Sequence, residues 1–314
     1  MSRFLVTGGA GFIGSHIVDA LVKKRHFVRV LDNFSSGKMG NLACVKNKIE
    51  LMRGDIRCPG TCLKAARGID FVLHQAALRS VPKSMSNPVE YNEVNIGGTL
   101  NMLEASLKSK VRRFIFASSS SVYGEVSRFP EKEDFLPQPI SPYALTKLTG
   151  EYYCRMFTHH YGLATMSLRY FNVYGPRQAL DDEYAVVIPK FIHCILHNEP
   201  PPIYGTGRQS RDFTYISNVT EANILAACTT GAESGVFNVA CGKDYSVLEL
   251  IGILNNIMHK DIKPQFLPKR AGDVFRTLAD ISRIKKKIGF RPRIGFTGGL
   301  KLTVEYFQRQ ERLR

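Results

Sequence analysis

Short apolar runs and longer segments of helical periodicity alternate through the first half of the chain. The segment after the first run repeats its apolar residues at the spacing of one helical face. Such alternation is typical of parallel βαβ units. We therefore expect an α/β fold with a doubly wound parallel (Rossmann) sheet that binds ligands at the carboxyl ends of its strands. The expected strands are residues 4–7, 27–31, 50–53, 71–74, 114–117 and 165–169, and the expected long helices are residues 90–108 and 141–161.

The pattern changes after Asn172, where proline and glycine become frequent and the regular alternation is lost. We expect residues 1–172 to form the Rossmann domain, with residues 212–230 returning to it. Residues 173–211 and 231–314 are expected to form a smaller C-terminal lobe that binds the substrate.

The composition is that of an ordinary globular protein. Hydrophobic residues make up 44% of the 314 positions, and no apolar run reaches the roughly 18 residues that a membrane span needs. A strand pattern begins within the first few residues, which leaves no room for a signal peptide. We expect a cytoplasmic protein without a membrane partner.

The net charge of +16 does not indicate nucleic-acid binding, because the basic residues are dispersed and no aromatic residues interleave with them. Attraction of an anionic nucleotide substrate, or solubility alone, accounts for the charge. The seven cysteines include one close pair, Cys58 and Cys62, but no second pair at zinc-ligand spacing. We expect reduced, mostly buried thiols and no metal site.

A glycine-rich turn joins the first expected strand to the first helix. Gly8, Gly11 and Gly14 allow a tight turn and the close approach of a dinucleotide pyrophosphate, whose charge faces the helix N-terminus. Asp32 ends the second strand, where a carboxylate can accept both hydroxyls of the adenine ribose and repel a 2′-phosphate. Asp55, after the third strand, is placed to contact the adenine. These residues favour NAD over NADP as the cofactor.

A second motif places an acid–base group beside this cofactor. Ser141 and Pro142 are typical of a helix start, and Tyr143 and Lys147 then share one helical face. A free phenol has a pKa near 10, and we expect the ammonium and a cationic nicotinamide to lower it. Tyr143 can then deprotonate an alcohol while a hydride leaves its carbon. The serines at 118–121 end a strand, where a hydroxyl can hydrogen-bond the same substrate oxygen.

The order of these motifs resembles the extended short-chain dehydrogenase/reductase family over nearly the whole chain. Within that family the chain is most similar to nucleotide-sugar 4-epimerases, especially UDP-glucose and UDP-N-acetylglucosamine 4-epimerases. The stretches that carry the resemblance are residues 7–14, 74–77, 95–99, 118–124, 143–147, 169–172, 211–213 and 270–273. The resemblance implies an NAD-dependent enzyme that inverts C4 of a UDP-hexose through a transient 4-keto sugar.

The resemblance also implies roles for individual residues. Tyr143 is the implied catalytic base, with Lys147 on the nicotinamide ribose. Ser119 is implied to hydrogen-bond the sugar 4-oxygen, with Ser121 close to the sugar. The further implied cofactor-binding residues are Gly8, Gly11, Phe12, Ile13, Gly14, Asp32, Asn33, Asp55, Ile56, Gln75, Ala76, Ala77, Asn95 and Tyr170. The implied substrate-binding residues are Ser80, Val81, Asn172, Val187, Tyr204, Arg211, Arg270, Asp273 and Thr277.

Other activities on the same fold are disfavoured by particular residues. Nucleotide-sugar 4,6-dehydratases resemble this chain but carry an Asp-Glu pair at the positions of Ser120 and Ser121. UDP-glucuronate decarboxylases usually have a glutamate at the position of Ser121, and this chain has no carboxylate there. A non-catalytic, NAD-binding regulator is disfavoured because Tyr143, Lys147 and Ser119 are all present.

Two positions bear on the choice of sugar. In the epimerases that the chain resembles, a tyrosine at the position of Thr277 restricts the pocket to UDP-glucose and UDP-galactose, and a smaller residue admits N-acetyl sugars. We therefore expect UDP-N-acetylglucosamine and UDP-N-acetylgalactosamine first, and UDP-glucose and UDP-galactose second. Arg79 stands where we expect a small residue. It could meet the carboxylate of a UDP-uronic acid or point to solvent.

The resemblance finally implies how copies of the chain associate. Enzymes of this kind are commonly homodimers joined through the helices that correspond to residues 90–108 and 141–161. We expect a homodimer here, with outward apolar residues on these helices at its interface.

Overall fold

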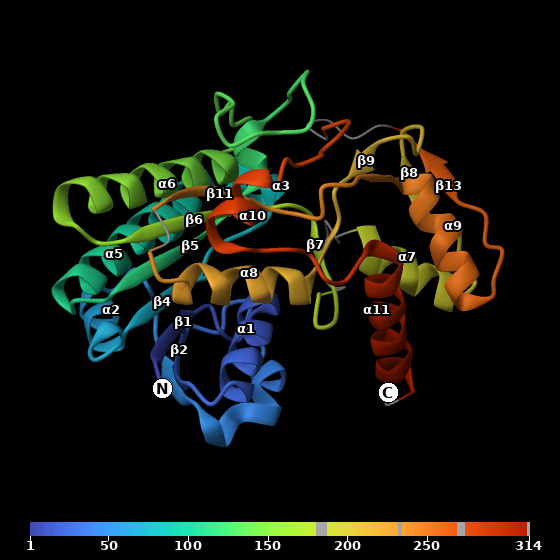
Figure 1. Cartoon of the computed structure of the whole chain (residues 1–314). Coiled ribbons are helices and arrows are strands. Elements are labelled where there is room, and N and C mark those ends of the chain that lie inside the picture. Colours follow the sequence, from blue (N-terminus) through green and yellow to red (C-terminus); the bar gives the residue numbers. More distant parts are fainter. Residues whose placement is uncertain (180–186, 232–233, 269–273, 313–314) are drawn as a thin grey trace.

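The larger part of the molecule is built on a parallel β-sheet, which lies on the left in Figure 1. The computed structural model describes residues 1–179, 187–231, 234–268 and 274–312. In these ranges the sheet has seven strands in the order β3-β2-β1-β4-β5-β6-β11, which confirms the predicted doubly wound α/β fold. The strands are β1 (Arg3–Thr7), β2 (Phe27–Asp32), β3 (Glu50–Arg53), β4 (Phe71–His74), β5 (Arg113–Ser119), β6 (Thr165–Tyr170) and β11 (Gly235–Val239).

Helices cover both faces of this sheet. On one face, α2 (Pro59–Ala66) and α6 (Pro142–Tyr161) pack against α5 (Gly98–Lys108). On the other, α1 (Phe12–Lys23) packs against α8 (Ile216–Cys228). After β3 the chain returns to the centre, so that β4 lies beside β1 and the strand order reverses there. In such sheets, ligands bind in the crevice at this reversal.

A smaller lobe packs around aromatic side chains. Its helices α7 (Val187–Leu196), α9 (Val247–Met258) and α11 (Phe296–Glu311) contact one another. Phe213 and Phe296 stack with ring centroids 5.0 Å apart, and Tyr174 donates a hydrogen bond to the Phe296 carbonyl at 2.9 Å. The described residues also form three strand pairs: β7 (Val173–Tyr174) with β10 (Thr214–Tyr215), β9 (Ser210–Arg211) with β12 (Tyr245–Ser246), and β8 (Pro202–Tyr204) with β13 (Gln265–Leu267).

The boundary between the two parts differs from the one expected from the sequence. β11 pairs with β6, and α10 (Ser282–Ile288) packs against β11. Phe237 and Ile284 are buried in the core of the large sheet. Residues 231–314 therefore do not all belong to the lobe. A short strand that is buried on both faces has no alternating pattern, so its place in the sheet cannot be read from its sequence.

The helix expected at residues 90–108 consists of three successive segments. α4 (Pro88–Tyr91) leads into the π-helical turn η2 (Asn92–Gly97), and α5 follows. A π-helical turn holds more residues per turn than an α-helix and is frequent near functional sites. The remaining helical segments are η1 (Met39–Lys48), α3 (Val81–Ser86) and η3 (Ser120–Tyr123).

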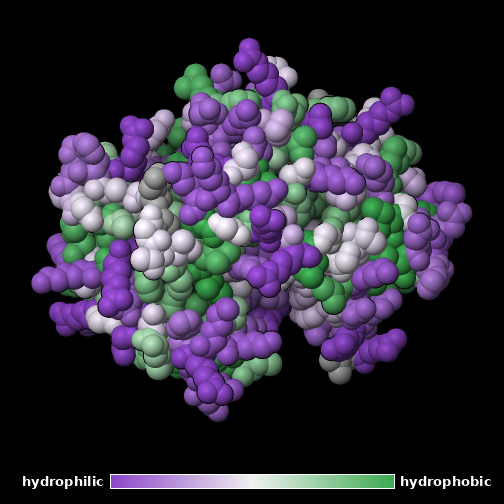
Figure 2. All heavy atoms as spheres, in the orientation of Figure 1, coloured by the Kyte–Doolittle hydropathy of each residue, from purple (hydrophilic) through white to green (hydrophobic). Residues whose placement is uncertain are grey.

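The surface in the view of Figure 2 mixes hydrophilic and hydrophobic residues. An indentation at the lower edge of this view separates the part that carries α1 from the part that carries α11. Among the described residues, no helix has both the length and the apolar character needed to cross a bilayer.

Candidate active site

One large cleft, with a volume of about 920 Å³, lies at the carboxyl ends of the central strands. Its walls come from the sheet, from α6 and from the lobe, and its volume suits a bound small molecule. The predicted site residues that line it are Gly8, Gly11, Phe12, Ile13, Gly14, Asp32, Asn33, Asp55, Ile56, Gln75, Ala76, Ala77, Val81, Ser119, Ser121, Tyr143, Lys147, Tyr170 and Asn172.

The turn between β1 and α1 leaves no room for side chains. Gly8 has a φ of +65°, and a Cβ there would lie 2.8 Å from the backbone of Ala76. A Cβ at Gly14 would collide with the carbonyl oxygen of Gly8. Gly11 is the N-cap of α1 and places no side chain over the first amides of the helix. The turn therefore forms a backbone cradle that fits a pyrophosphate at a helix N-terminus.

The Asp32 carboxylate is held in place by the backbone on both sides. Its Oδ2 accepts a hydrogen bond from the amide of Ala10 at 2.9 Å, and its Oδ1 accepts one from the amide of Phe34 at 2.8 Å. A carboxylate has about four acceptor positions, so two are left for the hydroxyls of a ribose. The backbone thus fixes the orientation of the Asp32 carboxylate at the wall of the cleft.

Asp55 lies beside this position. Its carboxylate accepts a hydrogen bond from the Asn33 amide at 2.9 Å and forms an ion pair with Arg57 at 2.9 Å. The hydrogen bond from Arg57 is the largest influence, and it holds the pKa of the Asp55 carboxyl well below its usual range. The carboxylate therefore stays charged at the adenine end of the expected cofactor position.

Asn95 does not belong to the wall of the cleft as far as the chain is described. It is buried in the π-helical turn, where its side chain hydrogen-bonds both backbone groups of Leu78, at 2.8 and 3.0 Å, and the Thr146 hydroxyl at 3.0 Å. Asn95 therefore fixes the loop after β4 against α6, and acts on the cleft through that loop.

Gln75 and Tyr170 close the floor of the cleft. The Tyr170 hydroxyl donates to the amide oxygens of Asn223, at 2.9 Å, and Gln75, at 3.2 Å. The Gln75 amide nitrogen donates to the same Asn223 oxygen at 3.0 Å. This network ties β4 and β6 to α8. The sequence predicted Gln75 and Tyr170 but gave no indication of Asn223.

Tyr143 lies in the first turn of α6, which Ser141 caps by accepting a hydrogen bond from the Ala144 amide at 3.2 Å. The Tyr143 and Ser119 side chains are hydrogen-bonded, and the Ser119 and Ser121 hydroxyls lie 2.8 Å apart. Burial raises the pKa of the Tyr143 phenol, while the hydrogen bond with Ser119 and the charge of Arg79 oppose the rise. Among the protein groups alone, burial outweighs the nearby charges, and the lowering expected from a cationic nicotinamide stays a prediction.

Lys147 follows Tyr143 by one helical turn. Its Nζ lies 5.9 Å from the centre of the Tyr143 ring and donates a hydrogen bond to the Ala117 carbonyl at 2.8 Å. Burial lowers the pKa of Lys147 to about 8, so the ammonium form still predominates at neutral pH. The nearby His74 is neutral, because burial, aided by the charge of Lys147, lowers its pKa to about 3.

A buried ion pair supports the strand that carries Ser119. The Arg169 guanidinium donates two hydrogen bonds to the Glu151 carboxylate, at 2.8 and 2.7 Å. The Ser118 hydroxyl donates to the same carboxylate at 2.5 Å. Loss of one partner would leave a buried charge uncompensated, so this network holds β5, β6 and α6 in one arrangement. The sequence analysis did not find it, because the three residues are far apart in the chain.

The predicted substrate-binding residues fall into two groups. Val81 and Asn172 line the cleft, and Thr277 reaches it only through a hydrogen bond of 3.2 Å to the Asn172 amide oxygen. Arg211 donates to the carbonyls of Ser210 and Phe275, at 2.8 and 3.2 Å. In the described structure, the predicted substrate-binding residues outside the wall of the cleft are Ser80, Val187, Tyr204, Arg211 and Thr277. Arg270 and Asp273 lie outside the described residues.

Several cleft residues were not predicted. The loop after β2 contributes Ser35, Ser36 and Lys38, and η1 contributes Asn41. The helix α11 contributes Tyr306, Phe307, Gln310 and Glu311. Arg177 also lines the cleft and pairs with Asp19 at 2.6 Å. The Gly175-Pro176 turn before Arg177 is a local signal that could have marked it. The residues of α11 have no such signal, because they reach the cleft only through the packing of the lobe.

Comparison with known proteins agrees with this geometry. Residues 4–240 match the NAD dependent epimerase/dehydratase family. The chain belongs to this family. Within the family, the chain is similar to NAD-dependent nucleotide-sugar 4-epimerases. The predicted family and the predicted cofactor, NAD, are both confirmed.

Individual members of the family cover almost the whole chain. A solved UDP-N-acetylglucosamine 4-epimerase from Methanobrevibacter ruminantium M1, in complex with UDP-N-acetylmuramic acid, is 43% identical, covers 98% of this chain and 99% of its own, and has a TM-score of 0.95. A UDP-glucose 4-epimerase from Thermotoga maritima with UDP-glucose is 39% identical at the same coverage, with a TM-score of 0.93. A UDP-glucose 4-epimerase from Mycolicibacterium smegmatis is 36% identical over 98% of each chain. Other relatives are UDP-glucuronic acid 4-epimerases and decarboxylases.

Proposed function

We propose that this protein is an NAD-dependent UDP-sugar 4-epimerase. The observation that carries the proposal is the position of Tyr143 in the cleft, hydrogen-bonded to Ser119 and one helical turn from Lys147. A phenol in this position can remove the proton of a sugar hydroxyl and return it. Ser120 and Ser121 occupy the positions at which related dehydratases and decarboxylases carry acids, so the acid needed for those reactions is missing.

The residues of the cleft supply binding, positioning and proton transfer. The Gly8–Gly14 turn would hold the pyrophosphate of NAD, and Asp32 its adenine ribose. When bound, NAD supplies the acceptor and then the donor of the C4 hydride, and its positive charge favours the Tyr143 phenolate.

Tyr143 accepts the proton of the sugar 4-hydroxyl while Ser119 donates a hydrogen bond to the same oxygen. Ser121 can donate to Ser119 across the 2.8 Å between their hydroxyls. The 4-keto sugar then turns over within the cleft, and Tyr143 returns the proton to the 4-oxygen. Substrate and product differ only in the configuration at C4, so the reaction involves no net oxidation. The turn of the sugar requires an anchored diphosphate, for which Arg211 and Arg270 are our candidates.

We favour UDP-N-acetylglucosamine and UDP-N-acetylgalactosamine as the substrate pair. A relative at 43% identity is a UDP-N-acetylglucosamine 4-epimerase. Thr277, which hydrogen-bonds the cleft residue Asn172, occupies less space than the tyrosine expected for an enzyme restricted to UDP-glucose. UDP-glucose is the second substrate that we would expect, because relatives at 39% and 36% identity are UDP-glucose 4-epimerases.

The test is to incubate the purified protein and NAD with UDP-N-acetylglucosamine and, separately, with UDP-glucose. Anion-exchange chromatography then resolves each substrate from its C4 epimer. We expect the N-acetyl substrate to epimerise faster. A Thr277→Tyr variant should lose the N-acetyl activity selectively, because the ring would crowd the C2 substituent beside Asn172. Failure of both substrates to react would contradict the proposal for these sugars.

Arg79 favours one further candidate, a UDP-uronic acid. Arg79 lines the cleft, and its charge acts on Tyr143. A guanidinium in the same cleft as the proposed base can pair with a carboxylate on the sugar. A UDP-glucuronic acid 4-epimerase from Bacillus cereus is among the relatives. We expect Arg79→Gln to lower kcat/KM for UDP-glucuronic acid by about tenfold more than it lowers kcat/KM for UDP-N-acetylglucosamine, because the loss of charge beside Tyr143 affects both sugars alike. Equal losses for both sugars would contradict it.

We also propose that the protein is a homodimer that associates through α6. Leu145, Tyr152 and Met156 are spaced to share one face of this helix, and they are 52%, 48% and 46% exposed. A row of large exposed apolar residues on one helix is typical of an association surface.

A further inference from the structure

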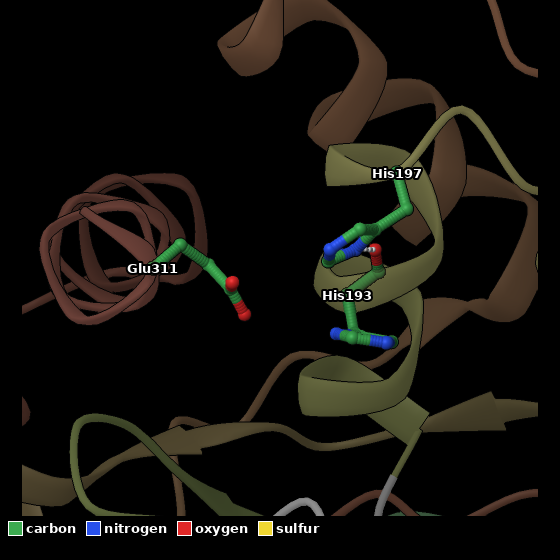
Figure 3. A group of neighbouring side chains, drawn as sticks. All are labelled: His193, His197 and Glu311. Atoms are coloured by element: carbon green, nitrogen blue, oxygen red, sulfur yellow. Dashed lines mark hydrogen bonds between the residues drawn. The ribbon is translucent and has the colours of Figure 1, made fainter. Parts of the chain in front are cut away.

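A group of metal-ligating side chains lies in the lobe, separate from Tyr143 and its partners. His193 and His197 come from α7 and the turn that continues it, and Glu311 comes from the last turn of α11. One potential ligand atom of each residue lies within 4.8 Å of those of the other two. Figure 3 shows the Glu311 carboxylate directed from α11 across the gap towards the two imidazole rings.

The two histidines are presented by one turn of helix. The amide of His197 donates a hydrogen bond to the carbonyl of His193 at 3.2 Å, so the helical hydrogen-bonding pattern continues to His197. The Nδ1 of His197 lies 2.9 Å from the same carbonyl. A hydrogen bond from Nδ1 to a carbonyl leaves the lone pair on Nε2, and this arrangement is typical of histidine that ligates a metal.

Neighbouring groups hold this turn in place, and one ring nitrogen of His193 is left without a hydrogen bond from the described residues. The Lys260 ammonium donates to the carbonyls of Ile195 and Leu196, at 2.8 and 2.9 Å, and thereby caps the end of α7. The Nδ1 of His193 is inaccessible to solvent and has no hydrogen-bond partner among the described residues. A buried ring nitrogen without a partner is unfavourable, and coordination would satisfy it.

We propose that His193, His197 and Glu311 bind one divalent transition-metal ion of the zinc type. Two imidazoles and one carboxylate are a ligand set that Zn²⁺ uses, with a fourth position open to water or another ligand. Mg²⁺ and Ca²⁺ prefer sites made of oxygen ligands and do not suit two imidazoles. The net charge of +16 gives no general attraction for cations, so binding here rests on coordination.

The ligand atoms of the three side chains need to move only slightly closer together to bind one ion. Ligands of a tetrahedral Zn²⁺ lie about 3.4 Å apart, from bond lengths of about 2.1 Å. The present separations of up to 4.8 Å could shorten to this value mainly through rotation of the Glu311 side chain, with the His197 ring kept in place by its Nδ1 hydrogen bond. The ion would fasten the end of α11 to α7. Because Gln310 and Glu311 also line the cleft, the ion would lie at its rim.

The test uses the full-length protein after treatment with a chelator, and Zn²⁺ as the only added ligand. Isothermal titration calorimetry should show one site per chain, and Zn²⁺ should raise the melting temperature. We expect His197→Ala and Glu311→Gln each to lower the Zn²⁺ affinity by at least about tenfold and to abolish most of the thermal shift. His197 is exposed and Glu311 only partly buried, so neither change should prevent folding.

Matched control variants separate this site from other histidines, carboxylates and thiols. His160→Ala removes an exposed histidine on α6, and Glu305→Gln removes an exposed carboxylate on α11. Both controls should bind Zn²⁺ as the unchanged protein does. Undiminished Zn²⁺ binding in both His197→Ala and Glu311→Gln would overturn the proposal. This result is the one expected if the exposed Cys44 or Cys58 binds the ion instead. Loss of binding in His160→Ala, or the absence of any binding by the unchanged protein, would also overturn the proposal.

Discussion

Tyr143 is under opposing influences within the cleft. Burial raises the pKa of its phenol, and the hydrogen bond with Ser119 and the charge of Arg79 oppose the rise. The protein alone therefore keeps the phenol protonated at neutral pH. A positively charged cofactor beside the phenol would favour its ionised form.

Replacement of Tyr143 by phenylalanine removes the proposed base and keeps the ring. We expect turnover to fall by at least about a hundredfold, because general base catalysis contributes that much, while NAD binding is retained. The measurements are the epimerisation rate and the amount of NAD bound to the variant. Tyr161→Phe removes a hydroxyl from the exposed end of α6 and should leave both unchanged. Turnover at the full rate in Tyr143→Phe would mean that another group is the base.

Glu131 makes stability depend on pH. Its side chain is only 2% exposed, and burial, with the neighbouring charge of Asp212, raises its pKa to about 8. Between the ordinary glutamate pKa and about 8, the folded state holds a proton that the unfolded state has lost. The contribution of Glu131 is therefore largest at acidic pH and is lost as the pH rises through 8.

Glu131→Gln replaces this carboxyl by a group that does not titrate. We expect the variant to have nearly the stability of the unchanged protein at pH 5 and to be more stable by more than about 1 kcal/mol at pH 9. Denaturant unfolding at the two pH values measures the difference. Glu104→Gln, which alters an exposed ion pair with Lys108, should change stability by less than about 0.5 kcal/mol at both. An equal effect of Glu131→Gln at pH 5 and pH 9 would refute the raised pKa.

Single residues were predictable where a local motif carries them. Tyr143, Lys147 and Ser119 lie in such motifs, and the structure brings all three to one cleft. The Ser118–Glu151–Arg169 network could not be predicted, because three separate elements contribute to it. Thr277 shows a second limit of prediction from sequence. Its position in the chain indicated that it lies near the substrate, but not that Asn172 lies between Thr277 and the cleft.

The β1–α1 turn depends on the absence of side chains at close backbone contacts. In Gly14→Ala the new Cβ would meet the backbone of Gly8 and Gly9, neither of which can move cheaply. We expect at least a tenfold loss of NAD affinity and a destabilisation of about 1–3 kcal/mol. Gly60→Ala is the matched control, because a Cβ there meets nothing within 4 Å, and it should stabilise α2 slightly. Unchanged NAD binding in Gly14→Ala would contradict the cradle.

Elements were predictable where periodicity is long or caps are local. Two of the expected strands, at residues 50–53 and 71–74, have the bounds of β3 and β4, and Ser141 and Pro142 mark the start of α6. The π-helical turn was not predicted, because its apolar pattern continues that of the flanking helices. The strands of two or three residues in the lobe were also missed, since their pairing joins distant segments such as β8 and β13.

The association of two copies is a property of the whole molecule. Tyr152 lies between Leu145 and Met156 on the exposed face of α6. We expect Tyr152→Glu to halve the mass measured by light scattering after size-exclusion chromatography, because a charged carboxylate would have to lose its water in the proposed apolar interface. Glu305→Lys on α11 changes charge away from both helices of the expected interface and should leave the mass unchanged. A monomeric unchanged protein would refute the dimer.

The late position of β11 in the sequence affects how the chain folds while it is being synthesised. The first six strands of the large sheet end at Tyr170, but β11 begins only at Gly235 and pairs with β6. While the ribosome adds the residues between them, β6 is an edge strand with unpaired backbone groups, and α8 is not yet available to cover the sheet. The nascent chain therefore depends on its last third to complete its first domain, and truncated chains should be aggregation-prone.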